Sequence, residues 1–87
     1  MIKLNIIFSP LAWQEYTNWQ IEDKKTLKRI NKLINDIQRH PFEGIGKPEP
    51  LTYELSGAWS RRIDTVNRIV YTVTSTAINI VQVKYHY

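Results

Sequence analysis

The sequence predicts an α+β domain in which two N-terminal helices pack on one face of a mainly antiparallel β-sheet. Two observations predict this fold. Apolar residues recur with a helical period through residues 24–40, and apolar and polar residues alternate from residue 51 onward. A short β-branched segment, 3–8, precedes the helices. We expect residues 1–87 to form a single domain, because this length supports one hydrophobic core.

Both expected helices have clear start signals. Ser9 followed by Pro10 is one, because serine caps a first helical turn and proline fits its first position. Asp23 is the expected cap of the second helix. The apolar face of this second helix consists of Leu27, Ile30, Leu33, Ile34 and Ile37. Its opposite face forms a basic ridge of Lys24, Lys25, Lys28, Arg29 and Lys32.

Residues 41–50, PFEGIGKPEP, hold three of the four prolines and two of the three glycines, so we expect a loop there. The strands that we expect after this loop are 51–55, 58–64, 68–74 and 78–87, with turns at 56–57, near 66–67 and at 75–76. With the helices on one face of the sheet, the other face is free to act as a working surface.

The composition restricts the kinds of site and partner that we expect. The chain has no cysteine and two histidines, and its carboxylates lack the spacing of metal ligands, so we expect neither a metal nor another cofactor. No apolar run reaches the roughly 20 residues that a membrane span needs, and the start lacks the features of a signal peptide. These features predict a cytoplasmic protein. The formal net charge of +4 favours an anionic partner, either nucleic acid or an acidic protein segment.

Candidates for acid–base chemistry lie in the second half of the chain. Glu49 stands between two prolines that restrict the backbone and would hold a catalytic carboxylate in place, although most loop glutamates are merely solvated. Arg61 and Arg62 point to opposite faces of their strand, so at most one shares the open face. Arg68 begins the next strand, and guanidinium groups match the geometry of phosphate.

His86 and Tyr87 close the sequence in KYHY. Chain ends often fray, but the apolar strand before them and the flanking tyrosines favour a docked end. The carboxylate of Tyr87 would then favour the protonated imidazole of His86, as a general acid near neutral pH requires. His40 is instead expected to lie at a helix C-terminus without a catalytic role. A carboxylate, arginines and a histidine suffice to cleave RNA through its own 2′-hydroxyl group.

The motifs PFEGIGKPEPL, LSGAWSRRI and the closing YHY resemble the Txe/YoeB family of toxins, within the RelE/ParE superfamily of toxin–antitoxin systems. The resemblance covers essentially the whole chain. It implies a microbial-ribonuclease-like fold, cleavage of mRNA in the ribosomal A site without a metal, and neutralisation by a YefM-type antitoxin. Homodimers also occur in the resembling family.

The resemblance also implies a role for each candidate residue. Glu49 would be the general base and Arg68 would stabilise the phosphorane. His86 would be the general acid, with Tyr87 completing the site. The implied contacts to substrate phosphates are Lys47 and Arg62.

The basic ridge resembles the surface with which the family meets ribosomal RNA, although a solvated helix face is an equal alternative for any single lysine. One departure concerns Thr52, which stands where the family usually has a lysine. This difference removes a cationic contact expected near the reacting phosphate, so a less active enzyme or compensation from elsewhere is expected.

Two alternatives remain open from the sequence. One is a ParE-like toxin that inhibits DNA gyrase through protein contact, and the other is a catalytically inert domain that holds an antitoxin. The fold permits all three functions, so the site must decide among them. The combination of Glu49, Arg68 and His86 favours the nuclease.

Overall fold

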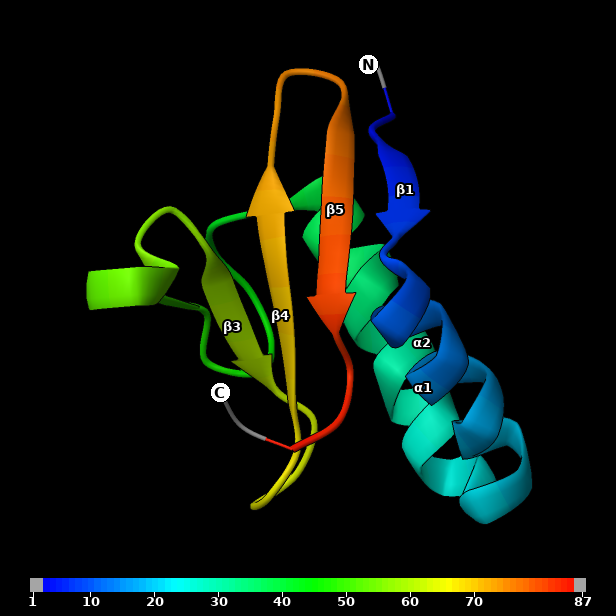
Figure 1. The fold of residues 1–87 in the computed structure, drawn as a ribbon. Helices are drawn as coiled ribbons and strands as arrows, with labels where there is room; N and C mark the ends of the chain where they lie inside the picture. Colours follow the sequence, from blue (N-terminus) through cyan, green and yellow to red (C-terminus); the bar gives the residue numbers. More distant parts are fainter. Residues whose placement is uncertain (1–2, 86–87) are drawn as a thin grey trace.

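The computed structural model describes residues 3–85 of the chain. Its elements are β1 (Asn5–Phe8), α1 (Pro10–Glu22), α2 (Lys24–Arg39), β2 (Glu49–Pro50), the 3₁₀ helix η1 (Tyr53–Leu55), β3 (Trp59–Arg62), β4 (Arg68–Val73) and β5 (Ala77–Gln82). The strands form one sheet in the order β1-β5-β4-β3-β2. Only the β1–β5 pair among these described strands is parallel. Both helices lie on one face of the sheet (Figure 1), which confirms the predicted fold class.

The helix caps agree with the sequence signals. The Ser9 hydroxyl accepts the Ala12 N–H at 3.0 Å, and Asp23 accepts the N–H groups of Lys25 and Thr26 at 3.0 and 3.3 Å. Each such cap contributes about 1 kcal/mol to helix stability. The Ser9 hydroxyl also donates to the Val81 carbonyl at 3.0 Å, so the start of α1 is tied to β5.

The main core lies between α2 and the central strands. Ile30, Leu33 and Ile37 of α2 are fully buried against apolar residues of β4 and β5, among them Ile69, Tyr71, Ile78 and Ile80. Full burial of one such aliphatic side chain contributes about 1.5–3 kcal/mol. None of the described helices is long and apolar enough to cross a membrane.

The prediction of a strand at residues 51–55 is wrong, and so is the prediction that residues 41–50 form a loop throughout. The segment that pairs with β3 is Glu49–Pro50, and residues 53–55 form η1. Leu51 and Ala58 close a compact connection through a 2.9 Å hydrogen bond from the Leu51 N–H to the Ala58 carbonyl. Tyr53 has a φ of +56° and is 93% exposed. The alternation in this segment therefore corresponds to no buried sheet face.

The predicted strand 78–87 also ends early, at Gln82. The reason is that the Val83 backbone bonds to α1 rather than to β4. Its N–H donates to the Glu15 carboxylate at 2.9 Å, and its carbonyl accepts the indole N–H of Trp19 at 2.9 Å. The other predicted boundaries differ from the observed ones by no more than two residues, as element ends commonly do.

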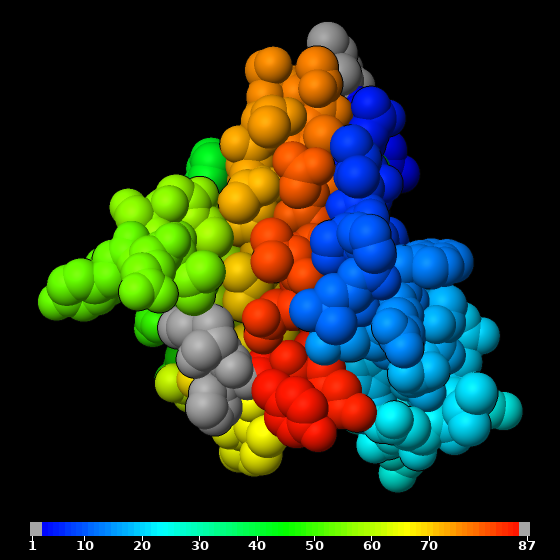
Figure 2. Space-filling view, in the orientation of Figure 1, coloured from blue at the N-terminus to red at the C-terminus, as the bar shows by residue number. Residues whose placement is uncertain are grey.

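The sheet face away from the helices is partly covered. Leu51, Ala58 and Val70 form a small buried cluster under the connection between β2 and β3. Figure 2 shows β4 and β5 on the surface of this face, with the connection projecting to one side. Among the described residues, the exposed part of this face lies toward the end of the sheet where β3 ends and β4 begins.

Candidate active site

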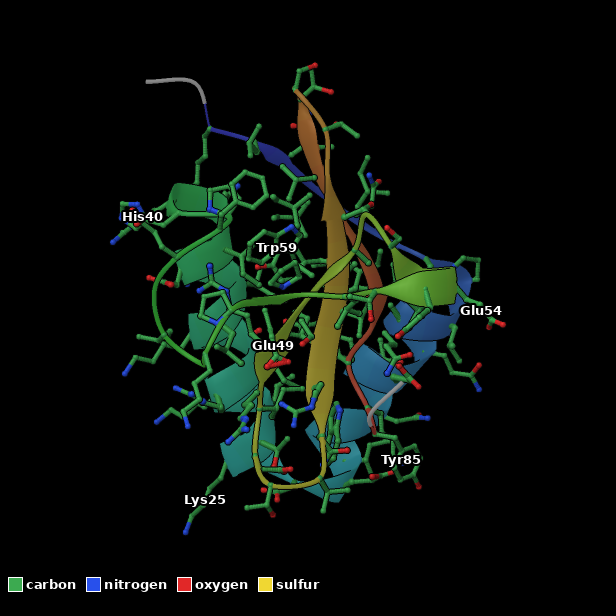
Figure 3. The ribbon with its side chains drawn as sticks, turned by 90° about the vertical axis from the view of Figure 1, so that its left-hand side faces the viewer. Lys25, His40, Glu49, Glu54, Trp59 and Tyr85 are labelled. Atoms are coloured by element: carbon green, nitrogen blue, oxygen red, sulfur yellow. The ribbon has the colours of Figure 1, made fainter. Side chains whose placement is uncertain are left out.

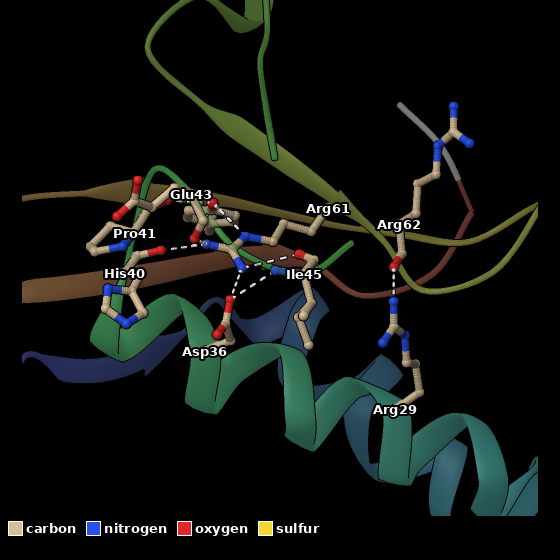
Figure 4. A network of polar contacts seen from close by, with 9 residues as sticks. Arg29, Asp36, His40, Pro41, Glu43, Ile45, Arg61 and Arg62 are labelled. Atoms are coloured by element: carbon tan, nitrogen blue, oxygen red, sulfur yellow. Dashed lines mark hydrogen bonds and ion pairs between the residues drawn. The ribbon is translucent and has the colours of Figure 1, made fainter. Parts of the chain in front are cut away.

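Three candidate residues lie on this open face of the sheet. Arg62 and Arg68 are directly opposite each other across β3 and β4, and Glu49 is opposite Ser60 across β2 and β3. Paired residues point to the same face, and so do residues two apart on a strand, such as Ser60 and Arg62. Glu49, Arg62 and Arg68 therefore share one face. Arg61 points the other way, toward α2 (Figure 4), so the predicted division of the two arginines is confirmed.

Among the described residues, none of these three side chains takes part in an ion pair or a side-chain hydrogen bond. Glu49 and Arg62 are exposed, and Arg68 is half-buried. Within residues 3–85, the ion pairs join other partners, Arg61 to Asp36 and Lys84 to Glu22. No carboxylate within residues 3–85 therefore pairs with either guanidinium group, and the fork of donors on each is suited to an anion.

A buried arginine, Arg61, fixes the loop that leads to Glu49. It donates to the carbonyl groups of His40, of Glu43 at 2.8 Å and of Ile45 at 3.1 Å. Figure 4 shows these bonds converging on one guanidinium group. Because Arg61 is 0% exposed, the backbone of residues 40–45 is held against β3 rather than left free in solvent.

Asp36 and Tyr71 complete this buried network. Burial raises the pKa of Asp36, but its bonds from Arg61 and from the Ile45 N–H, with the charge of Arg61, outweigh burial and leave the pKa below its ordinary value. The Tyr71 hydroxyl accepts from Arg61 Nε at 3.2 Å and donates to the Pro41 carbonyl at 2.7 Å. Burial raises the pKa of Tyr71, so it remains a neutral donor.

A glycine, Gly46, lies in the loop that leads to Glu49. Gly46 has a φ of +79°, and a Cβ atom there would lie 2.7 Å from Leu33 Cδ2. Its carbonyl accepts the Arg62 N–H at 2.7 Å, which places the following residues beside β3. Lys47 is next, with a φ of +51° and an exposed side chain. Lys47 and Glu49 thus follow a backbone that is anchored at two points, by Arg61 and by Gly46.

The last described residue, Tyr85, lies beside Arg68. The Arg68 N–H donates to the Tyr85 carbonyl at 2.9 Å, and the Tyr85 N–H donates to Asn67 Oδ1 at 2.7 Å. In Figure 3, Glu49 appears between α2, where Lys25 lies, and the segment that reaches Tyr85. His86 and Tyr87 lie outside the described residues, so their roles remain predictions.

The predicted basic ridge lies along α2. Its lysines, Lys24, Lys25, Lys28 and Lys32, are all exposed. Arg29 is half-buried, and its guanidinium group donates to the Arg62 carbonyl at 3.5 Å (Figure 4). The ridge therefore extends to the end of β3, where the open face begins. His40 is the C-terminal cap of α2, as predicted.

A family model described as the YoeB-like toxin of bacterial type II toxin-antitoxin systems matches residues 8–87. This chain belongs to that family. The curated toxin YoeB of Streptomyces coelicolor is 52% identical over 84 residues, which cover 97% of this chain and 100% of the relative.

Solved structures agree with the assignment. A YoeB dimer from Staphylococcus aureus is 50% identical with a TM-score of 0.91, covering 98% of this chain and 99% of that one. A YoeB–YefM complex from the same organism is 49% identical with a TM-score of 0.89 and the same coverage. The chain is thus a toxin of a type II toxin–antitoxin system by family.

For a YoeB-like toxin, the structure adds residues that the sequence analysis missed. The buried Arg61 and the partly buried Asp36 form an ion pair, Tyr71 joins it to the loop, and Asn67 contacts Tyr85. One signal was available for Arg61, since alternation on β3 directs it to the core face, where an arginine requires partners. Asn67 lay within a predicted turn and carried no such signal.

A pocket of about 300 Å³ lies apart from the open face. It is lined by Lys32, Asn35, Asp36, Arg39 and Ile45, and includes none of the candidate catalytic residues. Because the candidate catalytic residues lie outside this pocket, we place the candidate site of this YoeB-like toxin on the open face. Within residues 3–85, no three His, Asp or Glu side chains lie close enough together to hold a metal ion.

Proposed function

We propose that this toxin is a ribosome-dependent endoribonuclease that cleaves mRNA in the ribosomal A site and thereby inhibits translation. The observation that supports this most directly is the shared open face of Glu49, Arg62 and Arg68. A carboxylate and two guanidinium groups on one surface are the groups needed to activate a hydroxyl and to stabilise a phosphorane. Neither gyrase inhibition nor a purely antitoxin-binding role requires them.

The proposed reaction uses the 2′-hydroxyl group of RNA as nucleophile. Glu49 takes its proton, the 2′-oxygen attacks phosphorus, and Arg68 stabilises the charge on the phosphorane. The bond from phosphorus to the 5′-oxygen then breaks, and His86 gives that oxygen a proton while Tyr87 completes the site. The products are a 2′,3′-cyclic phosphate, which can hydrolyse to a 3′-phosphate, and a 5′-hydroxyl. No metal or other cofactor is required.

Substrate and ribosome contacts follow from the basic surface. We assign Lys47 and Arg62 to substrate phosphates, and the basic ridge on α2 to ribosomal RNA. The ribosome would hold the mRNA in line for attack, so naked RNA should be a poor substrate. Contacts of this kind are salt-sensitive, because each releases counterions from the nucleic acid.

We further propose a YefM-type antitoxin as the partner that neutralises the toxin, since the related S. aureus toxin is seen in a YoeB–YefM complex. A homodimer is the second proposed assembly, by analogy with the S. aureus dimer. Residues 1–87 would act as one domain in the bacterial cytoplasm, where ribosomes and mRNA are present.

The decisive experiment adds the toxin to a translating extract and maps the 5′ ends of the message. Cleavage within codons at the A site supports the proposal. Intact mRNA together with blocked DNA supercoiling would instead identify a gyrase inhibitor. Intact mRNA without that effect would leave the inert antitoxin-binding domain.

The assigned roles are tested by single changes. Glu49→Gln and His86→Gln should each abolish cleavage and leave the fold and antitoxin binding intact. Glu54→Gln is the matched control, because Glu54 is an exposed glutamate of η1 with the same charge. Deletion of Tyr87 should lower activity sharply, and a fully active truncation would remove Tyr87 from the site.

A further inference from the structure

Asn67 is a buried polar residue immediately before β4, with 9% of its surface exposed. The backbone carbonyl of Asn67 accepts the N–H groups of Ile63 and Asp64 at 3.0 and 3.3 Å, which closes the turn between β3 and β4. Asparagine is common in turns, but a turn alone does not require that its side chain be buried. The partners of the Asn67 amide therefore need a separate explanation.

The Asn67 side chain joins two segments that are distant in sequence. Its Nδ2 donates to Asp64 Oδ2 at 3.0 Å, and its Oδ1 accepts the N–H of Tyr85 at 2.7 Å. The Asp64 carboxylate can only accept and a backbone N–H can only donate, so this orientation of the amide is the one the network permits. Asp64 is itself fixed, because it accepts the N–H groups of Val66 and Asn67 at 2.8 and 2.6 Å.

Tyr85 is held on both sides of its backbone. Asn67 binds its N–H, and the N–H of Arg68 donates to its carbonyl at 2.9 Å. Tyr85 has a φ of +58°, a left-handed conformation that is unfavourable for residues other than glycine. Such a conformation persists only where the surroundings hold it. The two bonds supply that restraint directly beside Arg68.

We propose that Asn67 is a positioning residue that holds the backbone at Tyr85 in register with Arg68, and so sets the point from which the chain leads to His86. This inference rests on the proposed function, in which His86 protonates the leaving oxygen. Asn67 acts through Tyr85 and touches no substrate. The alternative is that Asn67 stabilises the turn and nothing more.

A substrate that needs no general acid separates these roles. We would use ribosome-bound mRNA in which sulfur replaces the leaving 5′-oxygen at the cleavage site, because a thiolate leaves without a proton. Asn67→Ala should lower the single-turnover rate on ordinary mRNA by about tenfold to a hundredfold, the scale of a misplaced catalytic group. The loss should largely disappear on the sulfur substrate, as it should for His86→Gln. Glu49→Gln should stay impaired on both.

Two further variants keep the test sharp. Asn67→Asp keeps an acceptor for the Tyr85 N–H but loses the donor to Asp64, so its stability should fall while its ratio of rates on the two substrates stays at the wild-type value. Asp64→Asn disturbs the turn and leaves the acceptor at Asn67 in place. Amide hydrogen exchange at Tyr85 should accelerate in Asn67→Ala and remain slow in Asp64→Asn.

The outcomes distinguish this inference from the proposed function. A wild-type chain that leaves ribosome-bound mRNA intact would refute both. Wild-type cleavage combined with an unimpaired Asn67→Ala, or with an equal loss on both substrates, would refute only the positioning role. If Asn67→Ala does not fold, an altered ratio of rates in Asn67→Asp would also overturn the inference, because that variant keeps the contact to Tyr85.

Discussion

Arg62 and Arg68 lie directly opposite each other across β3 and β4, on the open face of the sheet. Like charges in directly opposed positions destabilise a sheet. Neither guanidinium group is joined to a carboxylate within residues 3–85. The fold thus tolerates an electrostatic conflict at the place where we propose that a phosphate binds, as is common at functional sites.

Removal of one of these charges should therefore stabilise the fold while it weakens cleavage. Arg62→Gln should raise the free energy of unfolding by about 0.2–1 kcal/mol at low salt, and by less at high salt. Denaturant titration at two salt concentrations, alongside the cleavage assay, measures both effects. Lys3→Gln makes the same change in net charge at another exposed position. An equal gain in Lys3→Gln would mean that net charge, rather than the opposed pair, is responsible.

The buried network around Arg61 should be sensitive to the loss of a single hydroxyl. Tyr71→Phe leaves the Pro41 carbonyl and Arg61 Nε without this partner, which should lower the free energy of unfolding by about 1–3 kcal/mol. Amide exchange should also accelerate in residues 40–46. Tyr53→Phe is the matched control, because Tyr53 is 93% exposed, and it should change stability by less than about 0.5 kcal/mol. Comparable losses in both variants would contradict the role of the network.

Alanine substitutions at two glycines with positive φ distinguish the cost of backbone strain from the cost of a steric clash. Gly46→Ala and Gly57→Ala both place a Cβ atom at positive φ, +79° and +98°, at a cost of about 1–2 kcal/mol. Only at Gly46 does that atom also meet Leu33 at 2.7 Å, whereas nothing lies within 4 Å at Gly57. Thermal unfolding should show the larger loss for Gly46→Ala, and cleavage should fall with it because the backbone before Lys47 and Glu49 moves. Equal losses would show that strain alone acts.

The pH dependence of stability should carry a contribution from Asp36. Its pKa in the folded chain lies below the ordinary value of 3.8, despite burial, because Arg61 and the Ile45 N–H bind its ionised form. The stabilisation is therefore complete above pH 3.8 and is lost as the pH falls through the lower folded value. The free energies of unfolding of the wild type and of Asp36→Asn, measured in urea, should differ by a constant amount near neutral pH. The difference should shrink in acid, and a difference that is unchanged at about pH 2 would exclude this origin.

Much of the fold could be predicted because its signals are local. Ser9 and Asp23 cap their helices through N–H groups two or three residues away. The apolar face of α2 follows from the helical spacing of apolar residues within that helix. The segment 51–55 misled the prediction because five alternating residues also fit an exposed connection. Its true structure depends on Leu51 and Ala58 closing a hydrogen bond across it.

The candidate site also has a part that could be predicted from local sequence and a part that could not. Because Arg61 and Arg62 are adjacent on a strand, their opposite directions could be predicted. The bond from Arg61 to Asp36 joins residues 25 positions apart, and that from Tyr85 to Asn67 joins residues 18 apart. Such contacts depend on the register of the whole sheet, which no short motif specifies.

The parallel pairing of Asn5 with Ala77 has a consequence for the synthesis of the toxin. β5 lies between β1 and β4 in the sheet, so a chain interrupted before residue 77 lacks the strand that joins its first and middle parts. Contacts between such distant residues require the closure of a long loop, which costs entropy and slows folding. A nascent toxin consequently cannot assemble its sheet beside the ribosome that is making it until nearly all of these residues have emerged.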